Sequence, residues 1–257
     1  MIATNFYKKI CTHPNLSEND KFRIKIAVSE KELAQAQALR YEVFKAARGI
    51  GLKENSFIDT DIFDDYCLHL LVEEKITGRI VGTYRLQSGE VARRGAGFYS
   101  EQEFSIEGLD HVASKVIEAG RSCVSEEYRN GSVIGMLWAG IAEIMNRSKA
   151  KYLIGCVSLD TTDSNIGWEL YRHLADEGKL SEKVKAVPLP KYVLPASSGL
   201  SRGDIQLPPL FKGYLRLGCK ICGEPVLDRD FETIDFLILI DTAIMPERFR
   251  RHFKIGL

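Results

Sequence analysis

The range Val116–Trp138 constrains the fold more than any other part of the chain. In it an apolar run, a short turn with one glycine and a second apolar run follow one another directly. This order predicts a strand over about 115–124 and a helix over about 132–148. Backbone N–H groups at such a helix N-terminus form a ready anion site. We therefore expect a phosphate group to be held by the four residues of the turn, Arg129, Asn130, Gly131 and Ser132.

The predicted strand carries two charged side chains that could take part in chemistry. Glu118 lies between apolar residues, and Arg121 follows three positions later. Residues three apart on a regular strand point to opposite faces, so a β-bulge is needed to bring both to one face. A carboxylate beside an anion site is the equipment of an acyl transferase that uses a phosphate-bearing carrier. A surface salt bridge is the competing interpretation.

The charge balance and hydropathy of the chain argue against several protein classes. With 35 Lys+Arg and 35 Asp+Glu, the net charge is zero, and nothing global indicates nucleic acid binding. The N-terminus lacks the apolar run of a signal peptide, and the longest apolar runs have the length of a strand. We expect a cytoplasmic protein, with peripheral contact at the inner face of the membrane left open.

The six cysteines do not form the pattern of a metal site. Only Cys219 and Cys222 are spaced like metal ligands, and a zinc site would need a second such pair, which the sequence does not contain. In a cytoplasmic chain, cysteines are mostly reduced and buried. We therefore expect no metal site.

The spacing of apolar residues predicts one mixed domain of helices and strands. Residues 1–22 are expected to be a polar, loosely ordered extension. Residues 23–257 are expected to be a single α/β (α+β) domain whose central, mostly antiparallel sheet is flanked by helices. The segment 88–114 is expected to be irregular, and the proline-rich segment 188–209 an extended excursion. Further strands are predicted at 23–28, 67–73, 79–86, 152–157, 211–217 and 233–240, and further helices at 29–48 and 163–177.

An acidic loop lies between the first predicted helix and the strand that follows it. Its carboxylates are Asp59, Asp61, Asp64 and Asp65. A solvated loop, a divalent-metal site and a clamp for cationic groups are the competing interpretations, and the spacing excludes an EF-hand. Arg40 and Arg85 lie in mostly apolar surroundings, and a buried arginine needs a partner. This favours a lattice of Asp and Arg side chains that shapes a substrate pocket.

A second cationic group lies in the predicted strand 211–217. There, Lys212, Tyr214 and Arg216 alternate with apolar residues and would share one face. Such a face could bind a carboxylate or phosphate, or it could be a solvated outer face of the sheet.

The C-terminal range 246–257 predicts a short basic amphipathic helix. Phe249, Phe253 and Leu257 recur every four residues among arginines and a lysine. Such a helix could dock on the sheet, touch an anionic membrane or bind an acidic carrier protein.

Seven motifs, spread over about residues 35–240, give the chain a family resemblance. They are Leu39–Phe44, Asp59–Asp64, His69–Val72, Val81–Leu86, Gly97–Phe104, Glu118–Ile141 and Lys212–Gly218. In this order they resemble the bacterial ornithine-lipid N-acyltransferases. That family is itself similar to N-acyl amino acid synthases and to acyl-homoserine-lactone synthases, all with a GNAT-like fold of the acyl-CoA N-acyltransferase type.

The resemblance implies an activity and a set of roles. The acyl donor would be a 4′-phosphopantetheine thioester on acyl carrier protein, the acceptor an amino acid, and the product an amide, with no bound cofactor. Glu118 would be the general base, and the 129–132 turn would hold the pantetheine phosphate. A strand bulge beside Glu118 would separate two strands and admit the acyl arm. The substrate pocket would be built by Arg121 with Arg40, Asp61, Asp64 and Arg85, while one arginine, or Lys212 or Arg216, would bind the acceptor carboxylate.

The turn departs from the pattern of the wider fold in its glycine content. Members that bind coenzyme A usually carry a fuller glycine pattern there, whereas this chain has Gly131 alone in the turn and Gly135 in the helix. This favours a donor carried on a protein over free coenzyme A. A coenzyme-A-dependent acetyltransferase for small amines and a non-catalytic acyl-carrier-binding module remain the alternatives, and the sequence does not identify the acceptor.

Overall fold

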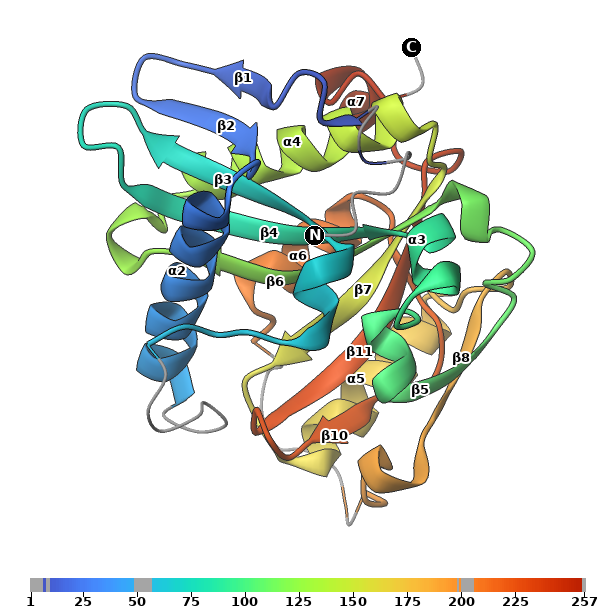
Figure 1. Ribbon diagram of the computed structural model, residues 1–257. Coiled ribbons are helices and arrows are strands. Elements are labelled where there is room, and N and C mark those ends of the chain that lie inside the picture. The colour runs from blue at the N-terminus through green and yellow to red at the C-terminus, as the bar shows by residue number, and fades with distance from the viewer. Residues whose placement is uncertain (1–6, 8–9, 49–56, 198, 200–205, 256–257) are drawn as a thin grey trace.

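The computed structural model describes residues 7, 10–48, 57–197, 199 and 206–255 (Figure 1). Its large sheet is built from β1 (Asn15–Glu18), β2 (Phe22–Ile26), β3 (Leu68–Glu74), β4 (Ile80–Ser88), β6 (Val116–Val124), β7 (Tyr152–Leu159), β9 (Lys220–Ile221), β10 (Val226–Asp228) and β11 (Thr233–Asp241). The order across this sheet is β1-β2-β3-β4-β6-β7-β11-β10, with β9 also paired to β11. Neighbours are antiparallel except β6 and β7, which are parallel. The expected mixed, mostly antiparallel sheet is confirmed.

Helices cover both faces of this sheet (Figure 1). Helix α2 (Glu30–Arg48) lays Ala36 and Leu39 against buried residues of β3 and β6. The opposite face is covered by α4 (Ser132–Ser148), α5 (Ser164–Asp176) and α6 (Pro209–Arg216). Gly82 on β4 leaves room for α4, because a Cβ there would overlap the side chain of Val133. The predicted helices and the β3–β4 hairpin are therefore confirmed.

The start of α2 follows from its sequence. The Ser29 hydroxyl accepts a hydrogen bond from the Glu32 backbone N–H at 3.3 Å, and the Glu32 carboxylate accepts one from the Val28 N–H at 2.8 Å. These bonds satisfy N–H groups that a helix start otherwise leaves unpaired.

The strand predicted at 211–217 is wrong, because the chain forms α6 there. Pro208 and Pro209 favour a helix start, since a proline ring presets the helical φ at the first position. Phe211 and Tyr214, three residues apart, are the buried residues of this helix. The tyrosine hydroxyls of Tyr84 and Tyr214 are hydrogen-bonded to each other. Strand β11 is paired with β7, β9 and β10.

Two segments expected to lack structure are in part regular. Residues 15–18 form β1 at the edge of the sheet, and Tyr7 and Ile10 are buried, so the expectation of a loose extension is wrong for these residues. Between 88 and 114 lie α3 (Gly89–Arg94), the short 3₁₀ helix η2 (Tyr99–Gln102) and β5 (Phe104–Glu107). Strand β5 pairs with β8 (Lys185–Pro188), where the proline-rich excursion begins. Residues 198 and 200–205 of that excursion lie outside the described residues.

The C-terminal segment docks on the domain. Helix α7 spans Glu247–His252, and Phe249 and Phe253 pack against the main core. The predicted position of Leu257 on the same face lies outside the described residues. Docking, one of the three interpretations of this segment, is thus confirmed for the two phenylalanines.

Two irregularities in the sheet position the candidate site. The β4–β6 register passes from Thr83↔Cys123 to Arg85↔Gly120, so β6 holds one extra residue, and Arg121 has a φ of 54°. The parallel pairing of β6 with β7 covers only residues 116–118 with 152–154. Beyond that point the two strands diverge (Figure 1).

Candidate active site

A cavity of about 260 Å³ opens where β6 and β7 diverge. Residues from β4, β6, β7 and the β10–β11 hairpin line it. Those that carry the argument below are Arg85, Gln87, Glu118, Arg121, Cys156 and Asp235. The structure therefore brings the predicted base, Glu118, and two of the predicted arginines to one cavity.

Glu118 is buried at the wall of the cavity and held by the start of η2. Its carboxylate accepts hydrogen bonds from the backbone N–H of Tyr99 at 2.6 Å, the N–H of Ser100 at 2.9 Å and the Ser100 hydroxyl at 2.7 Å. Burial raises the pKa of Glu118 above its usual range, although the Ser100 and Tyr99 hydrogen bonds oppose this rise. A carboxylate with a raised pKa is better suited to accept a proton near neutral pH.

The β6 bulge brings Arg121 to the same cavity that Glu118 lines. The sequence argument required such a bulge, and the structure confirms it. The Arg121 guanidinium donates to the Tyr99 hydroxyl at 3.3 Å and to Asp61 at 3.1 Å. It also lies over the Tyr99 ring, 4.9 Å from the centroid, and over the Phe231 ring at 5.3 Å. This position is fixed by both charge and stacking.

Arginines and aspartates form the expected lattice next to the cavity. Arg40, fully buried, donates through Nε to Asp59 at 2.8 Å and through both terminal nitrogens to the two Asp64 oxygens, each at 2.8 Å. Arg85 donates to Asp61 at 2.5 Å and to Asp64 at 2.9 Å. The predicted pairing of these groups is confirmed. Since Arg40 is enclosed and does not line the cavity, its contact is with the aspartates that hold the other arginines.

The lattice sets the charge states of its members. Burial works against ionisation of Asp64, but hydrogen bonding to Arg40 and the charges of Arg40 and Arg85 outweigh it and lower the pKa of Asp64. Burial lowers the pKa of His69 to about 4, which leaves the ring neutral at pH 7. The lattice thus consists of ion pairs with a neutral histidine beside them.

The predicted phosphate turn lies at the N-terminus of α4, next to the open end of β6. Gly131 has a φ of 93°, in the left-handed region that favours glycine. The Asn130 side chain accepts from both the Ser132 N–H at 3.1 Å and the Ser132 hydroxyl at 2.7 Å. All four predicted residues, Arg129 to Ser132, are exposed. The turn is therefore accessible to a ligand from solvent.

Two predicted binding residues lie elsewhere. Lys212 and Arg216 are exposed on α6, one helical turn apart. The buried side of α6 contacts Tyr84, whose side chain points to the sheet face opposite that of its neighbour Arg85. Neither cation lines the cavity.

The geometry can be compared with known proteins. The family model "Acetyltransferase (GNAT) domain" matches residues 39–139. An L-ornithine N(alpha)-acyltransferase of Agrobacterium fabrum is 32% identical over 245 residues, which cover 89% of this chain and 84% of the relative. A protein of the same name from Rhodobacter capsulatus is 30% identical over 247 residues, 90% of this chain and 94% of the relative. The chain belongs to the L-ornithine N(alpha)-acyltransferase family.

Membership in this family confirms the resemblance found in the sequence and makes the protein an acyltransferase that uses a thioester donor. Two solved structures share its fold. TofI aligns with a TM-score of 0.52 at 14% identity, over 92% of this chain and 97% of its own. FeeM, an N-acyl amino acid synthase from uncultured soil microbes, aligns with a TM-score of 0.50 at 10% identity, over 87% and 92%. At these identities the likeness concerns the fold, and the GNAT-like expectation is confirmed.

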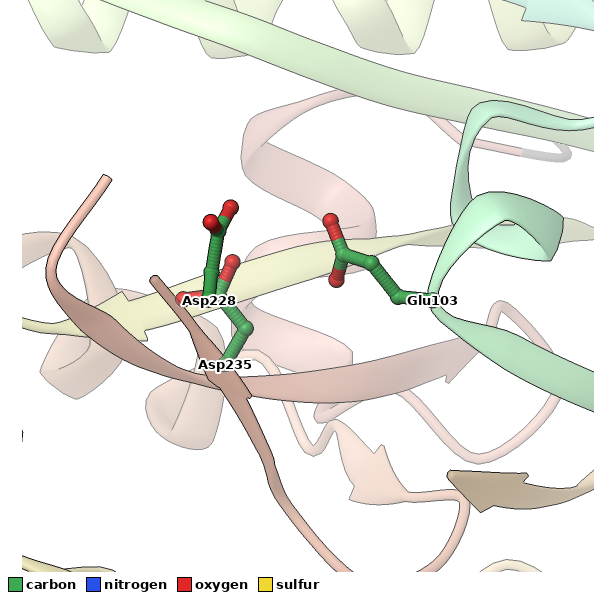
Figure 2. Close-up of side chains that lie close together, drawn as sticks. All are labelled: Glu103, Asp228 and Asp235. Carbon is green, nitrogen blue, oxygen red and sulfur yellow. The ribbon is translucent and has the colours of Figure 1, made fainter. Parts of the chain in front are cut away.

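This acyltransferase holds a buried acidic cluster that the sequence analysis missed. Carboxylate oxygens of Glu103, Asp228 and Asp235 all lie within 4.8 Å of one another, and all three residues are buried (Figure 2). Such a group could hold a cation. No sequence signal indicated it, because Glu103 is more than 120 positions from the other two.

Among the described residues, no helix is long and apolar enough to cross a membrane. The cysteines that had ligand-like spacing, Cys219 and Cys222, are both buried beside β9. Burial raises the pKa of each thiol to about 12.

Proposed function

We propose that the protein transfers a 3-hydroxyacyl or other fatty acyl group from acyl carrier protein to the α-amine of an ornithine-like amino acid. The product is an N-acyl amino acid of the lyso-ornithine-lipid type. One observation carries the proposal: Glu118 and Arg121 both line a cavity that opens at the divergence of β6 and β7. The names of the relatives support ornithine as acceptor.

The donor arm enters between β6 and β7 in this proposal. Past Ile154, the edge of β7 that faces β6 is no longer paired with it, and Val157 and Ser158 line the cavity there. An extended pantetheine arm can pair with such an edge through its amides. Its phosphate lies at the 129–132 turn, where the α4 N-terminus favours an anion.

The acceptor binds on the Glu118 side of the cavity. Its carboxylate is held by the Arg121 guanidinium, with Arg85 behind it. Asp59, Asp61 and Asp64 act as positioning residues, because they hold these guanidiniums and do not contact the acceptor. Lys212 and Arg216 have no part in this arrangement, since they lie outside the cavity.

The reaction is a direct transfer. Glu118, directly or through a water molecule, takes a proton from the acceptor ammonium, and the free amine attacks the thioester carbonyl carbon. An N–H on the unpaired edge of β7 stabilises the oxyanion of the tetrahedral intermediate. The C–S bond then breaks, and the second proton of the amine nitrogen passes to the pantetheine sulfur, which leaves as a thiol.

Two thiols in and near the cavity, Cys156 and Cys123, are poorly suited to form a covalent acyl-enzyme. Burial, together with the charges of Glu103, Asp235 and Glu118, raises the pKa of the Cys156 thiol well above its usual range. Cys123 is also buried, which raises the pKa of its thiol to about 12. Both thiols stay protonated at neutral pH, and a protonated thiol is a poor nucleophile. These states support direct transfer.

The test is an acylation assay with purified protein. We expect an N-acyl amide when 3-hydroxyacyl carrier protein is mixed with ornithine, and less with other amino acids in a panel. Absence of an amide with every acceptor would contradict the proposal. Acetyl transfer from coenzyme A to a small amine, without carrier protein, would favour the coenzyme-A-dependent acetyltransferase in place of this proposal. Binding of carrier protein without turnover would favour the non-catalytic binding module.

A further inference from the structure

We propose that Glu103, Asp228 and Asp235 bind the side-chain ammonium group of the acceptor and so select an amino acid with two amines. This inference rests on the proposed function, because it assigns the far end of the same cavity to the far end of the same acceptor. Among the described residues, Glu103 and Asp228 form no ion pair with Arg85 or Arg121, which are paired with Asp59, Asp61 and Asp64.

The three carboxylates come from separate elements that converge on one point. Glu103 follows η2, Asp228 ends β10, and Asp235 lies on β11. Figure 2 shows Glu103 reaching from the η2–β5 segment toward the two aspartates of the β10–β11 hairpin. Their exposed fractions are 3%, 5% and 6%, so all three carboxylates are buried.

The acidic cluster and Glu118 lie at two ends of one cavity. Asp228, Asp235 and Glu118 all line it. Between them lies Cys156, whose thiol donates to Glu103 at 3.5 Å and whose ionisation is opposed by Glu103, Asp235 and Glu118 together. An acceptor with its α-amine at Glu118 therefore extends a short side chain past Cys156 toward the cluster.

Two of the three carboxylates, Glu103 and Asp228, have no ion-pair partner among the described residues. Burial and the charges of Asp235 and Asp228 raise the pKa of Glu103 well above its usual range. A cation placed among the three would compensate these charges, and an ammonium group has three N–H donors to offer them.

Two buried polar side chains, one on the cavity wall and one next to the acidic cluster, give independent support for a ligand. Gln87 lines the cavity beside Glu118, is 2% exposed, and neither amide atom has a hydrogen-bond partner among the described residues. Thr233 is fully buried opposite Asp228 and on the same face as Asp235, and its hydroxyl likewise has none within the described ranges. Buried polar groups are rarely left without a partner, so polar groups of a ligand are expected near both side chains.

The discriminating experiment compares two acceptors that differ only in the side-chain amine. Ornithine carries it, and 2-aminopentanoate does not. We expect the wild-type protein to prefer ornithine by roughly 10- to 100-fold in kcat/KM, the size of one charged hydrogen-bonded contact. Asp235→Asn and Glu103→Gln should lower kcat/KM for ornithine by a similar factor and leave that for 2-aminopentanoate unchanged.

A matched control lies on the same hairpin. Asp230 is an exposed carboxylate, paired with Lys191 at 3.6 Å, and does not line the cavity. Asp230→Asn should keep the wild-type preference for ornithine. Calorimetric binding of the two amino acids to each variant gives a second readout that does not depend on turnover, and it should show the same selectivity.

Several results would overturn the inference. Equal losses with both acceptors would mean that the cluster only supports the fold. Loss of activity with a chelator, restored by Mg²⁺ or Mn²⁺ in the wild type and not in Asp235→Asn, would make the cluster a metal site. If the wild type acylates ornithine and 2-aminopentanoate equally, the subsite is wrong while the proposed function stands. If it acylates no amino acid and calorimetry finds equal binding of both, the proposed function and the subsite fail together.

Discussion

Glu118 combines burial with three hydrogen bonds, and the balance between them sets its protonation. In its proposed role as general base Glu118 must be ionised, so kcat/KM should fall as the pH drops through its raised pKa. Glu118→Gln should remove this acidic limb and lower kcat/KM by roughly 10²–10⁴-fold. The pH profiles of both proteins measure this.

Ser100→Ala is the matched control for that substitution. It removes one hydrogen bond to the Glu118 carboxylate, a bond that lowers the carboxyl pKa, and leaves the carboxylate itself in place. The acidic limb should therefore move to higher pH, with most of the maximal rate retained. A Glu118→Gln protein with the wild-type profile would remove Glu118 from the role of base.

Asp64 is the residue on which the stability of the lattice depends most. It accepts from Arg40, Arg85 and Gln37, so Asp64→Asn leaves buried cations without their partner and should cost about 3–5 kcal/mol of unfolding free energy. Asp65→Asn, at an exposed neighbouring carboxylate, should cost less than about 0.5 kcal/mol. Denaturant unfolding at pH 7 compares them.

The difference in unfolding free energy between wild type and Asp64→Asn should depend on pH in a definite direction. The pKa of Asp64 is lower in the folded protein than in the unfolded chain. Its stabilising contribution is thus complete above the unfolded pKa, about 4, and is lost as the pH falls through the folded value. The difference in unfolding free energy between wild type and Asp64→Asn should therefore become smaller as the pH falls. A gap that widens below pH 4 would contradict the lattice.

Among the elements, the divergence of β6 and β7 determines the cavity. Gly155 lies where the strands still approach closely, and a Cβ there would overlap the carbonyl oxygen of Ala119. Gly155→Ala should cost about 1–3 kcal/mol of stability by overpacking and should lower activity, because it displaces β6 next to Glu118. Thermal unfolding and the acylation rate measure the two effects.

A helical glycine with free space around it provides the comparison. A Cβ at Gly135 of α4 would meet nothing within 4 Å. Gly135→Ala should therefore raise stability by about 0.5–1 kcal/mol, as expected for an exposed helical position. Equal destabilisation by both substitutions would mean that the close approach at Gly155 has no special effect.

How far the elements could be predicted depends on how local their signals are. The strand and helix of 116–148 carry their own periodicity and turn residues, and both were predicted within a residue or two. Helix α6 was missed because Gly213 interrupts a short pattern that also fits a strand; in the helix, this glycine makes room for the Trp138 ring.

Within the candidate site, too, the parts with a signal in the sequence could be predicted and the parts formed by long-range contacts could not. The lattice of Arg40, Arg85 and the loop aspartates was predictable, because buried arginines need acidic partners and the acidic loop supplies several carboxylates within a few residues. The cluster of Glu103 with Asp228 and Asp235 was not, because its members look like ordinary surface acids until the β5 segment folds over the β10–β11 hairpin. Long-range convergence of this kind leaves no periodic pattern.

At the scale of the whole molecule, charge is organised locally, since the net charge is zero. Next to the cavity, the positive charges of the arginines and the negative charges of the aspartates compensate each other in the lattice. The carboxylates of Glu103, Asp228 and Asp235 form a separate cluster. On α7, Arg248 and Arg251 are exposed while Phe249 packs inward. A basic outer face on a docked helix is suited to an acidic carrier protein or an anionic membrane, and these partners remain proposals.

The central claim is that this molecule acylates an amino acid with Glu118 as base. Mass spectrometry of lipids from cells that overproduce the protein tests it most directly, with cells producing Glu118→Gln at the same level as the comparison. We predict a new amide-linked N-acyl amino acid, ornithine-containing and 3-hydroxyacylated, in the wild-type extract and its near absence in the variant extract. No new N-acyl amino acid in the wild-type extract, or equal amounts in both, would contradict the account.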